Sequence, residues 1–171
     1  METWPVRPLR RSRQGLTPAE CQTVLERGTS GVLAVLGDGG CPYAVPLNYA
    51  LDGGRILFHS APEGHKLDAL RRHPEASFCV VDCAEVRPET LSTRYRSVIA
   101  FGRVRIIEDA DRFREALRLF VLRFVPDTEM ALRVAMEESP ARLVMLEFLI
   151  ERMSGKQARE LCDGTRMTDT G

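Results

Sequence analysis

Six short stretches rich in apolar residues, each bounded by glycine, proline or polar residues, dominate the pattern of this chain. Stretches of this length with such boundaries are typical of β-strands. The first is almost continuously apolar, which predicts burial on both faces of a sheet, whereas the last alternates apolar and polar residues. We expect strands at 31–36, 43–51, 55–59, 76–82, 95–107 and 141–152.

Helical spacing of apolar residues marks four other segments. The first begins at Thr17-Pro18-Ala19-Glu20, which has the form of a capping box, and ends at Gly28. The others cover 64–72, 109–123 and 127–138. We assign the apolar stripe of the 109–123 helix to core or dimer packing.

Two local features refine this plan. The segment 84–93 is polar and contains Pro88, so we expect a loop there. The long fifth strand is expected to bend at Gly102. The cluster Gly37-x-Gly39-Gly40 does not indicate a dinucleotide-binding domain, because it lies in a strand-to-strand turn with no helix after it.

Strands that follow one another with few helices between them favour an antiparallel sheet that closes into a full or half-open barrel. The expected fold class is therefore mainly β with flanking helices (α+β). The 171 residues, 44% of them hydrophobic, suffice for one compact domain with a core.

Charge and composition limit the classes of binding partner that we expect. The chain carries 24 Lys and Arg against 24 Asp and Glu, so it lacks the basic excess of many nucleic-acid or membrane-surface binding proteins, and we expect neither partner. No apolar run approaches the roughly 20 residues of a membrane span. The N-terminus also lacks the apolar region of a signal peptide, and this predicts a cytoplasmic protein.

The cysteines indicate neither disulfides nor a metal site. Five are scattered along the chain, and only Cys79 and Cys83 are close together. Since no second cysteine or histidine pair stands at ligand spacing, we expect no metal.

The densest chemistry in the sequence lies at 58–66, where a predicted strand passes into a predicted helix. Ser60, His65 and Lys66 stand around the start of that helix, whose unpaired N–H groups and partial positive charge favour anions. A phosphorylated ligand is therefore indicated. For His65 the alternative is a solvated residue of the first helical turn.

Five motifs in this order resemble the FMN-binding split barrels of the pyridoxamine 5'-phosphate oxidase superfamily, in particular its nitroimidazole-resistance (Nim) branch. They stand at 31–34, 42–49, 58–66, 95–102 and 154–156. The resemblance implies a six-stranded antiparallel split β-barrel and a homodimer with FMN at its interface. The chain then divides into an N-terminal arm, 1–15, a flavin-binding barrel, 16–157, and a C-terminal tail, 158–171.

The resemblance also assigns the flavin contacts. Backbone of the second strand would hold the isoalloxazine edge, at Val45, Pro46, Leu47 and Asn48. Basic and hydroxyl side chains after the third strand would hold the phosphate, and these are His59, Ser60, His65 and Lys66. Ser97 would contact FMN from a later strand. His65 stands where the oxidases proper carry arginine, which makes phosphate binding more dependent on pH.

His59 is the candidate catalytic residue. It matches a histidine near the flavin ring of some Nim-like proteins and could donate a proton to a reduced substrate. The alternative is a histidine that only hydrogen-bonds backbone at a strand end. Flavin chemistry needs no catalytic triad, and the sequence contains no hydrolase elbow.

The implied function is that of an FMN-dependent oxidoreductase, nitroreductase-like or flavin-reductase-like, that passes electrons from a donor such as NAD(P)H to a small flat acceptor. Vitamin B6 oxidation is not expected, because the only tryptophan, Trp4, lies in the arm and the C-terminal Trp and Arg of true oxidases are absent. Two alternatives stay open: a flavin-binding or flavin-sensing module without turnover, and the same barrel with F420 or haem.

Overall fold

The computed structural model describes residues 8–125, 127–137 and 142–162. Trp4, the beginning of the expected arm and most of the expected tail lie outside the described residues. The strands are β1 (Ser30–Leu36), β2 (Pro42–Asn48), β3 (Ala50–Asp52), β4 (Arg55–Ser60), β5 (Glu75–Arg87), β6 (Ser92–Ile106) and β7 (Val144–Gln157). The α-helices are α1 (Pro18–Arg27), α2 (His65–Arg72), α3 (Ala110–Phe124), α4 (Thr128–Glu137) and α5 (Arg159–Cys162). No helix of the described residues is long and apolar enough to cross a membrane.

The strands form one antiparallel sheet in the order β2-β1-β5-β6-β7-β4-β3. β2 and β3 stand at opposite ends of this order, yet only Tyr49 separates them in the chain. One residue cannot span the width of an open sheet, so the sheet is rolled until its two edges meet at Tyr49. The predicted α+β class with an antiparallel barrel is confirmed.

The strand count differs from the prediction. The expected strand at 43–51 is two strands, because the chain passes from one edge of the sheet to the other at Tyr49. Six expected strands therefore become seven in the part of the chain that the structure describes. Both prolines of the first part, Pro42 and Pro46, lie on β2, and an edge strand tolerates residues that cannot donate a backbone hydrogen bond.

The predicted loop at 84–93 is wrong. β5 continues to Arg87 and β6 begins at Ser92, and these two residues face each other at the end of a long hairpin. A 3₁₀ turn at Pro88–Thr90 and Leu91 in the left-handed region connect the strands. The hairpin extends beyond the core, so its side chains are mostly polar, and this made the sequence look like a loop.

Gly102 lies where a bend was expected, and the register of β6 and β7 shifts there: Phe101 faces Arg152, whereas Gly102 faces Ile150. The extra residue on β7 is Glu151, as in a β-bulge. A Cβ at Gly102 would collide with the backbone of Leu149, so the close approach of β7 requires glycine.

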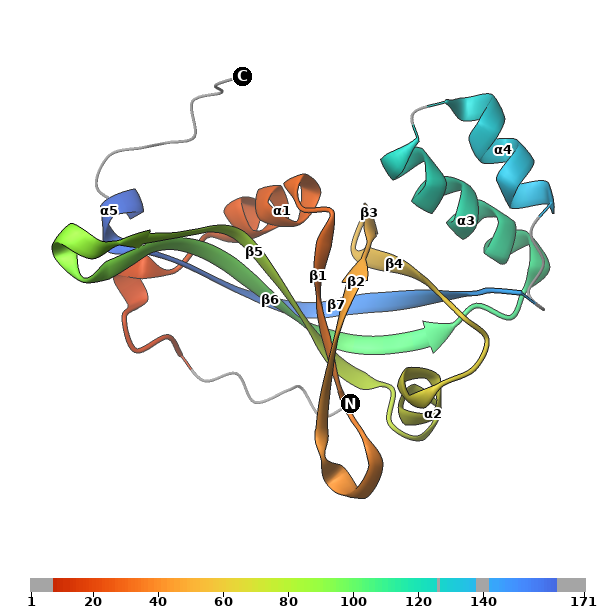
Figure 1. The fold of residues 1–171 in the computed structure, drawn as a ribbon, viewed down its shortest axis with the longest axis horizontal. Helices are drawn as coiled ribbons and strands as arrows, with labels where there is room; N and C mark the ends of the chain where they lie inside the picture. Colours follow the sequence, from red (N-terminus) through yellow and green to blue (C-terminus); the bar gives the residue numbers. More distant parts are fainter. Residues whose placement is uncertain (1–7, 126, 138–141, 163–171) are drawn as a thin grey trace.

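The core has two parts. The larger fills the barrel with side chains such as Leu33, Phe58 and Phe78. The smaller lies between α3 and strands β3, β4 and β7, where Phe113 packs with Leu57. Figure 1 shows α3 and α4 side by side at one end of the molecule, α1 near the middle, and α5 at the other end. The predicted capping box of α1 is confirmed, since Thr17 and Glu20 each accept a backbone hydrogen bond from the other residue.

The outer face of the sheet, away from the barrel core, is apolar but uncovered. On β1, Leu33 and Val35 point inward, whereas Val32 remains 40% exposed. Val32 faces Cys79 across the β1–β5 pair, and Cys79 faces Ile99, which is 38% exposed. Burial of β1 on both faces was expected, and within a single described chain it occurs on one face only. We call Val32, Leu36, Cys79, Val81 and Ile99 the outer patch.

Candidate functional site

The exit of β4 sets three neighbouring side chains in different environments. Strand alternation buries Phe58 in the barrel core and directs His59 to the other side, where its ring packs against Phe120 and remains partly exposed. Ser60 ends the strand with a buried side chain. After a short connection, Gly64 precedes α2 with a φ of 120°, which glycine tolerates and other residues rarely adopt. No side chain caps this helix start, so its first N–H groups have no side-chain acceptor.

Lys66, in the first turn of α2, is a half-buried cation. Burial lowers the pKa of its ammonium group. No carboxylate of the described part of the chain forms an ion pair with it. Burial, and after it the positive charge of Lys66, lowers the pKa of His59 below its usual range. An ammonium group that is partly desolvated and lacks a carboxylate favours an anionic ligand.

His65 has different surroundings from Lys66, although the two are adjacent in sequence. Its ring stacks on Tyr43 with 4.3 Å between centroids. Its Nε2 atom lies 3.7 Å from Oδ2 of Asp38, a carboxylate that also pairs with Arg72. His65 is therefore directed toward the turn between β1 and β2, where a carboxylate already competes with any phosphate.

The expected flavin residues of β2 lie on the edge of the sheet. Val45 and Leu47 point inward and pack against the core, whereas Pro46 and Asn48 point outward and are exposed. In the described structure β2 pairs only with β1, so the backbone groups along its other side have no strand partner. Asn48 donates from Nδ2 to the carbonyl oxygen of Thr29 at 3.2 Å.

Ser97 is not near the other candidates in this chain. It faces Lys156 on β7, whereas Ser60 faces Val144. Those two β7 residues are twelve positions apart, roughly 40 Å along a strand. β7 runs along much of the molecule in Figure 1, with α5 at the Ser97 end and α2 near the other. A ligand held by Ser60 and Lys66 therefore does not reach Ser97 of the same chain.

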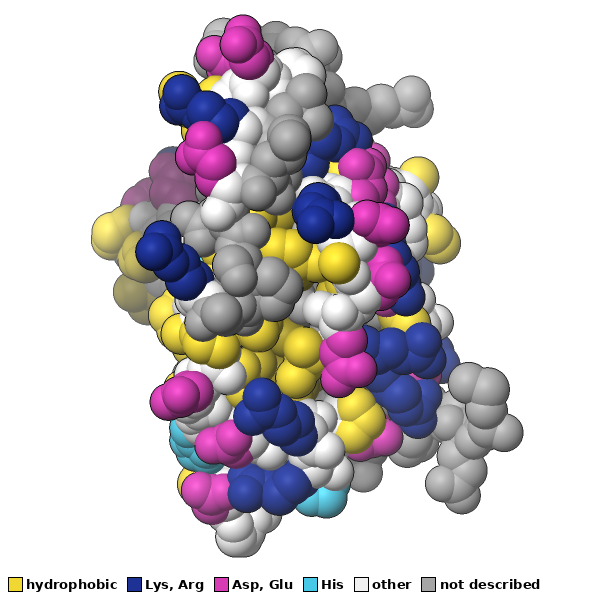
Figure 2. Space-filling model, turned by 90° about the vertical axis from the view of Figure 1, so that its right-hand side faces the viewer, with side chains coloured by type: hydrophobic (Ala, Val, Ile, Leu, Met, Phe, Trp, Pro, Cys, Tyr) yellow, Lys and Arg dark blue, Asp and Glu magenta, His cyan; other side chains and the backbone are white. Residues whose placement is uncertain are grey.

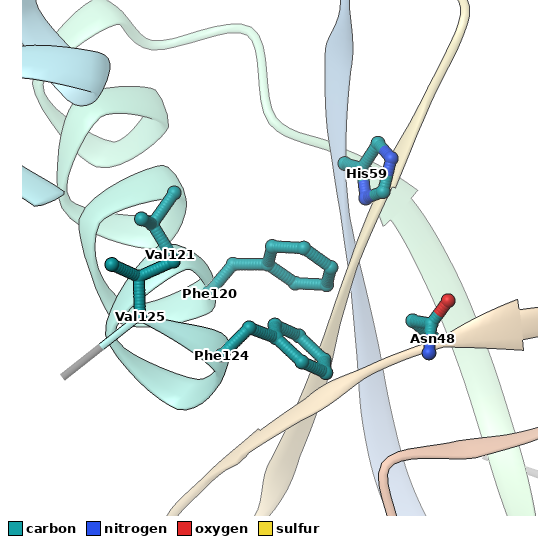
Figure 3. Close-up of a pocket in the computed structure, with 6 residues that line it drawn as sticks. All are labelled: Asn48, His59, Phe120, Val121, Phe124 and Val125. Atoms are coloured by element: carbon teal, nitrogen blue, oxygen red, sulfur yellow. The ribbon is translucent and has the colours of Figure 1, made fainter.

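A cavity of about 340 Å³ opens between β4, β2 and the C-terminal half of α3. His59 and Asn48 form its polar side, and four apolar side chains of α3 and its end form the rest: Phe120, Val121, Phe124 and Val125. In Figure 3, Phe120 and Phe124 point from the helix toward the strands that carry His59 and Asn48. The ring of His59 meets Phe120 edge-on, 4.8 Å between centroids.

The α3 side of this cavity was missed by the sequence analysis, which assigned the helix stripe to packing alone. The available signal was its length: apolar residues continue past Phe120 to Val121, Phe124 and Val125, more than one core-facing stripe needs. Figure 2 shows apolar side chains gathered on this side of the molecule, below the α3–α4 pair and above the charged side chains around α2.

Hydrogen bonds tie both sides of the cavity to the end of α1. Arg123 of α3 donates from Nη2 to the carbonyl oxygens of Glu26, Arg27 and Gly28 at 2.9 to 3.2 Å. Next to Asn48, the hydroxyl of Tyr49 donates to the carbonyl oxygen of Leu25 at 2.6 Å. Tyr49 is fully buried, and burial raises its pKa to about 12.

Among the described residues, no three His, Cys, Asp or Glu side chains gather in a way that could hold a metal ion. The chemistry of the site is instead that of a half-buried cation, an exposed edge strand and an apolar cavity with one imidazole. These features, on a rolled antiparallel sheet, define a split barrel with a candidate small-molecule site at its rim.

Residues 17–157 match the family model described as Pyridoxamine 5'-phosphate oxidase. The chain belongs to this family. No protein in the curated set matches the sequence.

Solved structures agree with the fold. A candidate 5-nitroimidazole antibiotic resistance protein from Bacteroides thetaiotaomicron is 21% identical, with a TM-score of 0.69 over 83% of this chain and 85% of that one. The FAD and heme binding protein from Mycobacterium smegmatis is 23% identical, with a TM-score of 0.73 over 85% and 74%. An FAD-binding protein from Mesorhizobium loti is 27% identical, with a TM-score of 0.57 over 84% and 96%.

Proposed function

We propose that this protein binds FMN and acts as a flavin-dependent oxidoreductase of the nitroreductase-like or flavin-reductase-like type, related to the nitroimidazole-resistance branch of its family. The observation that carries the proposal is Lys66, a half-buried ammonium group without a carboxylate partner among the described residues. It stands in the first turn of a helix whose start has no side-chain cap. Both features favour a phosphate.

The phosphate site that we propose consists of Lys66, Ser60 and the N–H groups at the start of α2, with His65 and His59 at its border. Ser60 is buried at the end of β4, shortly before α2 in the chain, and offers a hydroxyl group. His65 is the weaker ligand of the set, because Asp38 lies 3.7 Å from its Nε2 atom. A nearby carboxylate reduces the attraction of an imidazolium group for a second anion.

The isoalloxazine edge is proposed to lie along β2. β2 is an edge strand in the described chain, and its side away from β1 has no strand partner. Alternate residues between Val45 and Asn48 therefore leave backbone groups open to a ligand. Backbone N–H and C=O groups at an edge suit a ring system with alternating donors and acceptors.

A homodimer is proposed to complete the site. The outer patch leaves Val32, Val81 and Ile99 exposed on one face of the sheet, and a second copy would cover it. Ser97, which lies far from Ser60 in its own chain, would then contact the flavin bound to the partner. Ser97 pairs with Val81 across the β5–β6 hairpin and so stands on the same face as the patch.

A bound flavin supplies the two-electron chemistry. In the proposed reaction NAD(P)H gives a hydride, and a nitroaromatic acceptor takes two electrons and two protons to become a nitroso compound and water. His59 is proposed to hand over one of these protons. The protonated, donating form of His59 becomes more abundant as the pH falls, and burial moves this rise to lower pH because it lowers the pKa. The rate should therefore rise below neutral pH in the wild type and not in His59→Gln.

FMN is preferred to FAD or haem because the proposed anion site has one compact group of phosphate ligands around α2. Structural neighbours that bind FAD, or FAD and heme, keep those cofactors as alternatives, and F420 also shares the architecture. We propose a cytoplasmic location, since Cys21, Cys41, Cys79 and Cys83 are free thiols.

The experiment starts from purified protein. We expect a yellow sample that releases FMN on denaturation, as identified by mass, and whose colour is bleached by NADPH or NADH without oxygen and restored by a nitroaromatic compound. Bound flavin that no donor bleaches would indicate the second candidate, a flavin-binding or flavin-sensing module. A colourless protein that cannot be loaded with FMN would refute the proposal.

Lys66→Ala tests the phosphate assignment. We expect FMN affinity to fall at least tenfold, because a hydrogen bond to a charged group contributes about 1.5–3 kcal/mol. Arg71→Ala is the matched control, since Arg71 lies on the same helix but pairs with Asp68. Equal affinities for FMN in the two variants would show that Lys66 does not bind the phosphate.

A further inference from the structure

The cavity meets the proposed phosphate site at His59 and otherwise has its own lining. None of Ser60, His65 and Lys66 lines it. Its volume of about 340 Å³ lies at the small end of the range for small-molecule sites, which suits one or two fused rings. A second ligand therefore has room there beside a flavin that rests on β2 and β4.

The lining of the cavity disfavours charged ligands more strongly than it limits the size of a ligand. All six lining side chains are uncharged at neutral pH, since burial and Lys66 favour the neutral form of His59. A charged ligand would lose its hydration and gain no counter-ion from these side chains. His59 and Asn48 offer hydrogen bonds at one side only, whereas Phe120 and Phe124 offer ring faces and edges opposite.

The α3 side of the cavity is fixed by hydrogen bonds of a residue that does not line it. Arg123 lies between Phe120 and Phe124 in the sequence of α3, and its guanidinium group donates to three carbonyl oxygens at the end of α1. The same end of α1 accepts from Tyr49, the neighbour of Asn48. Both sides of the cavity therefore share one anchor, which fixes the gap between them.

We propose that this cavity binds the electron acceptor and selects flat aromatic molecules without a net charge, with Phe124 and Val125 as specificity-determining residues. This inference rests on the proposed flavin-dependent function. It extends the acceptor site to α3, which lines one side of the cavity. It also predicts that the site prefers uncharged acceptors, which we call the charge rule.

The test uses FMN-loaded, oxidised protein without a donor, so that binding is measured without turnover. Three probes share one ring and differ in charge: 4-nitrotoluene, 4-nitrobenzoate and 4-nitrobenzylamine. By isothermal titration calorimetry we expect 4-nitrotoluene to bind at least tenfold more tightly than either charged probe. Equal or tighter binding of a charged probe would overturn the charge rule.

Two variants locate the binding site. Val125→Phe should fill the cavity and weaken 4-nitrotoluene binding at least tenfold, whereas Phe124→Ala should weaken it about tenfold by removing a ring contact. Leu91→Ala is the control, because Leu91 is a fully exposed apolar residue at the distant hairpin tip. Unchanged binding in both cavity variants would place the acceptor elsewhere.

Flavin content, read from the absorbance of the same samples, separates the two possible failures. Full FMN occupancy with unchanged nitrotoluene binding overturns this inference and leaves the proposed function standing. Wild-type protein that takes up no FMN overturns the proposed function itself. Full occupancy with selective loss of neutral-ring binding in Val125→Phe supports both.

Discussion

The two faces of the sheet contain similar residues in opposite situations. On the inner face, Leu33, Phe78 and Val98 are completely buried by the chain itself. On the outer face, Val32 and Ile99 have the same apolar character, and more than a third of each remains exposed. Apolar surface in water costs about 25 cal/mol per Å² relative to burial. This chain therefore completes one face by folding and leaves the other open, as the proposed dimer requires.

Charged side chains show the same contrast between groups that are paired within the chain and groups that are not. Glu147 is buried and pairs with both Arg55 and Arg112, so its charge is compensated within the chain. Lys66 is half-buried and has no such partner among the described residues. Groups satisfied inside the chain should control folding, whereas groups left unsatisfied should control binding. The substitutions below test that division.

The largest effect is expected on the inner face. Phe78→Ala should lower the free energy of unfolding by about 3–5 kcal/mol, because it leaves a cavity where Phe58 and Tyr49 now meet the ring. Urea denaturation measures the change, with Leu91→Ala as the exposed reference. A loss below about 1 kcal/mol would mean that the inner face is not the folding core.

On the outer face, Ile99→Asp should break association and spare the fold. We expect light scattering to show one chain in place of two, with a dimer dissociation constant at least a hundredfold higher, which is about 2.7 kcal/mol. The carboxylate would have to be buried in the interface without a partner. Val86→Asp, on the exposed hairpin, is the matched control. Dimers that survive Ile99→Asp at the same concentration would contradict the division between the faces.

Arg123→Met removes the hydrogen bonds between α3 and the end of α1. Its effect should be smaller, because the Arg123 side chain is partly exposed. We expect a loss of about 1–2 kcal/mol in unfolding free energy and a several-fold higher KM for the acceptor with FMN affinity unchanged. Arg123→Lys should restore part of both, because an ammonium group can still reach a carbonyl oxygen. An unchanged KM in Arg123→Met would mean that these hydrogen bonds of Arg123 contribute to stability and not to acceptor binding.

The smallest effect concerns the pKa of His59. In flavin-free protein, Lys66→Met should raise this pKa, because a positive charge that disfavours the imidazolium form is removed, while burial continues to lower it. The wild-type chain, whose His59 titrates below its usual 6.5, should lose stability as the pH falls below about 6.5, since the unfolded chain binds the proton first. NMR titration of the imidazole measures the shift, and a pKa that stays constant or falls would place Lys66 too far away to matter.

Most of the fold could be predicted because strand and helix patterns are local. The capping box at Thr17, the glycine turns and the strand exit at Ser60 all carry their signal in a few neighbouring residues. Tyr49 could not be recognised as a junction, because no turn residue marks the place where the chain changes edges. The polar hairpin around Pro88 looked like a loop, since strands beyond the core lack apolar alternation.

The candidate site divides similarly. The places of Ser60 at a strand end and of Lys66 in the first turn of a helix were predictable from the local pattern, and the structure confirms these places. The separation of Ser97 from them depends on the pairing of β4 and β6 with different parts of β7, which no local pattern reveals. The α3 wall depends on a contact between residues such as His59 and Phe120 that are far apart in sequence. What the sequence could not predict in each case is long-range packing.

The position of β7 in the sheet has a consequence for synthesis. β7 is the last strand among the described residues, yet it lies between β6 and β4, and Arg55 faces Leu149 across that pairing. On the ribosome, β3 and β4 emerge long before the strand that joins them to the sheet. The barrel can therefore close only when translation of the domain is nearly complete, and the nascent chain keeps its apolar strands uncovered until then.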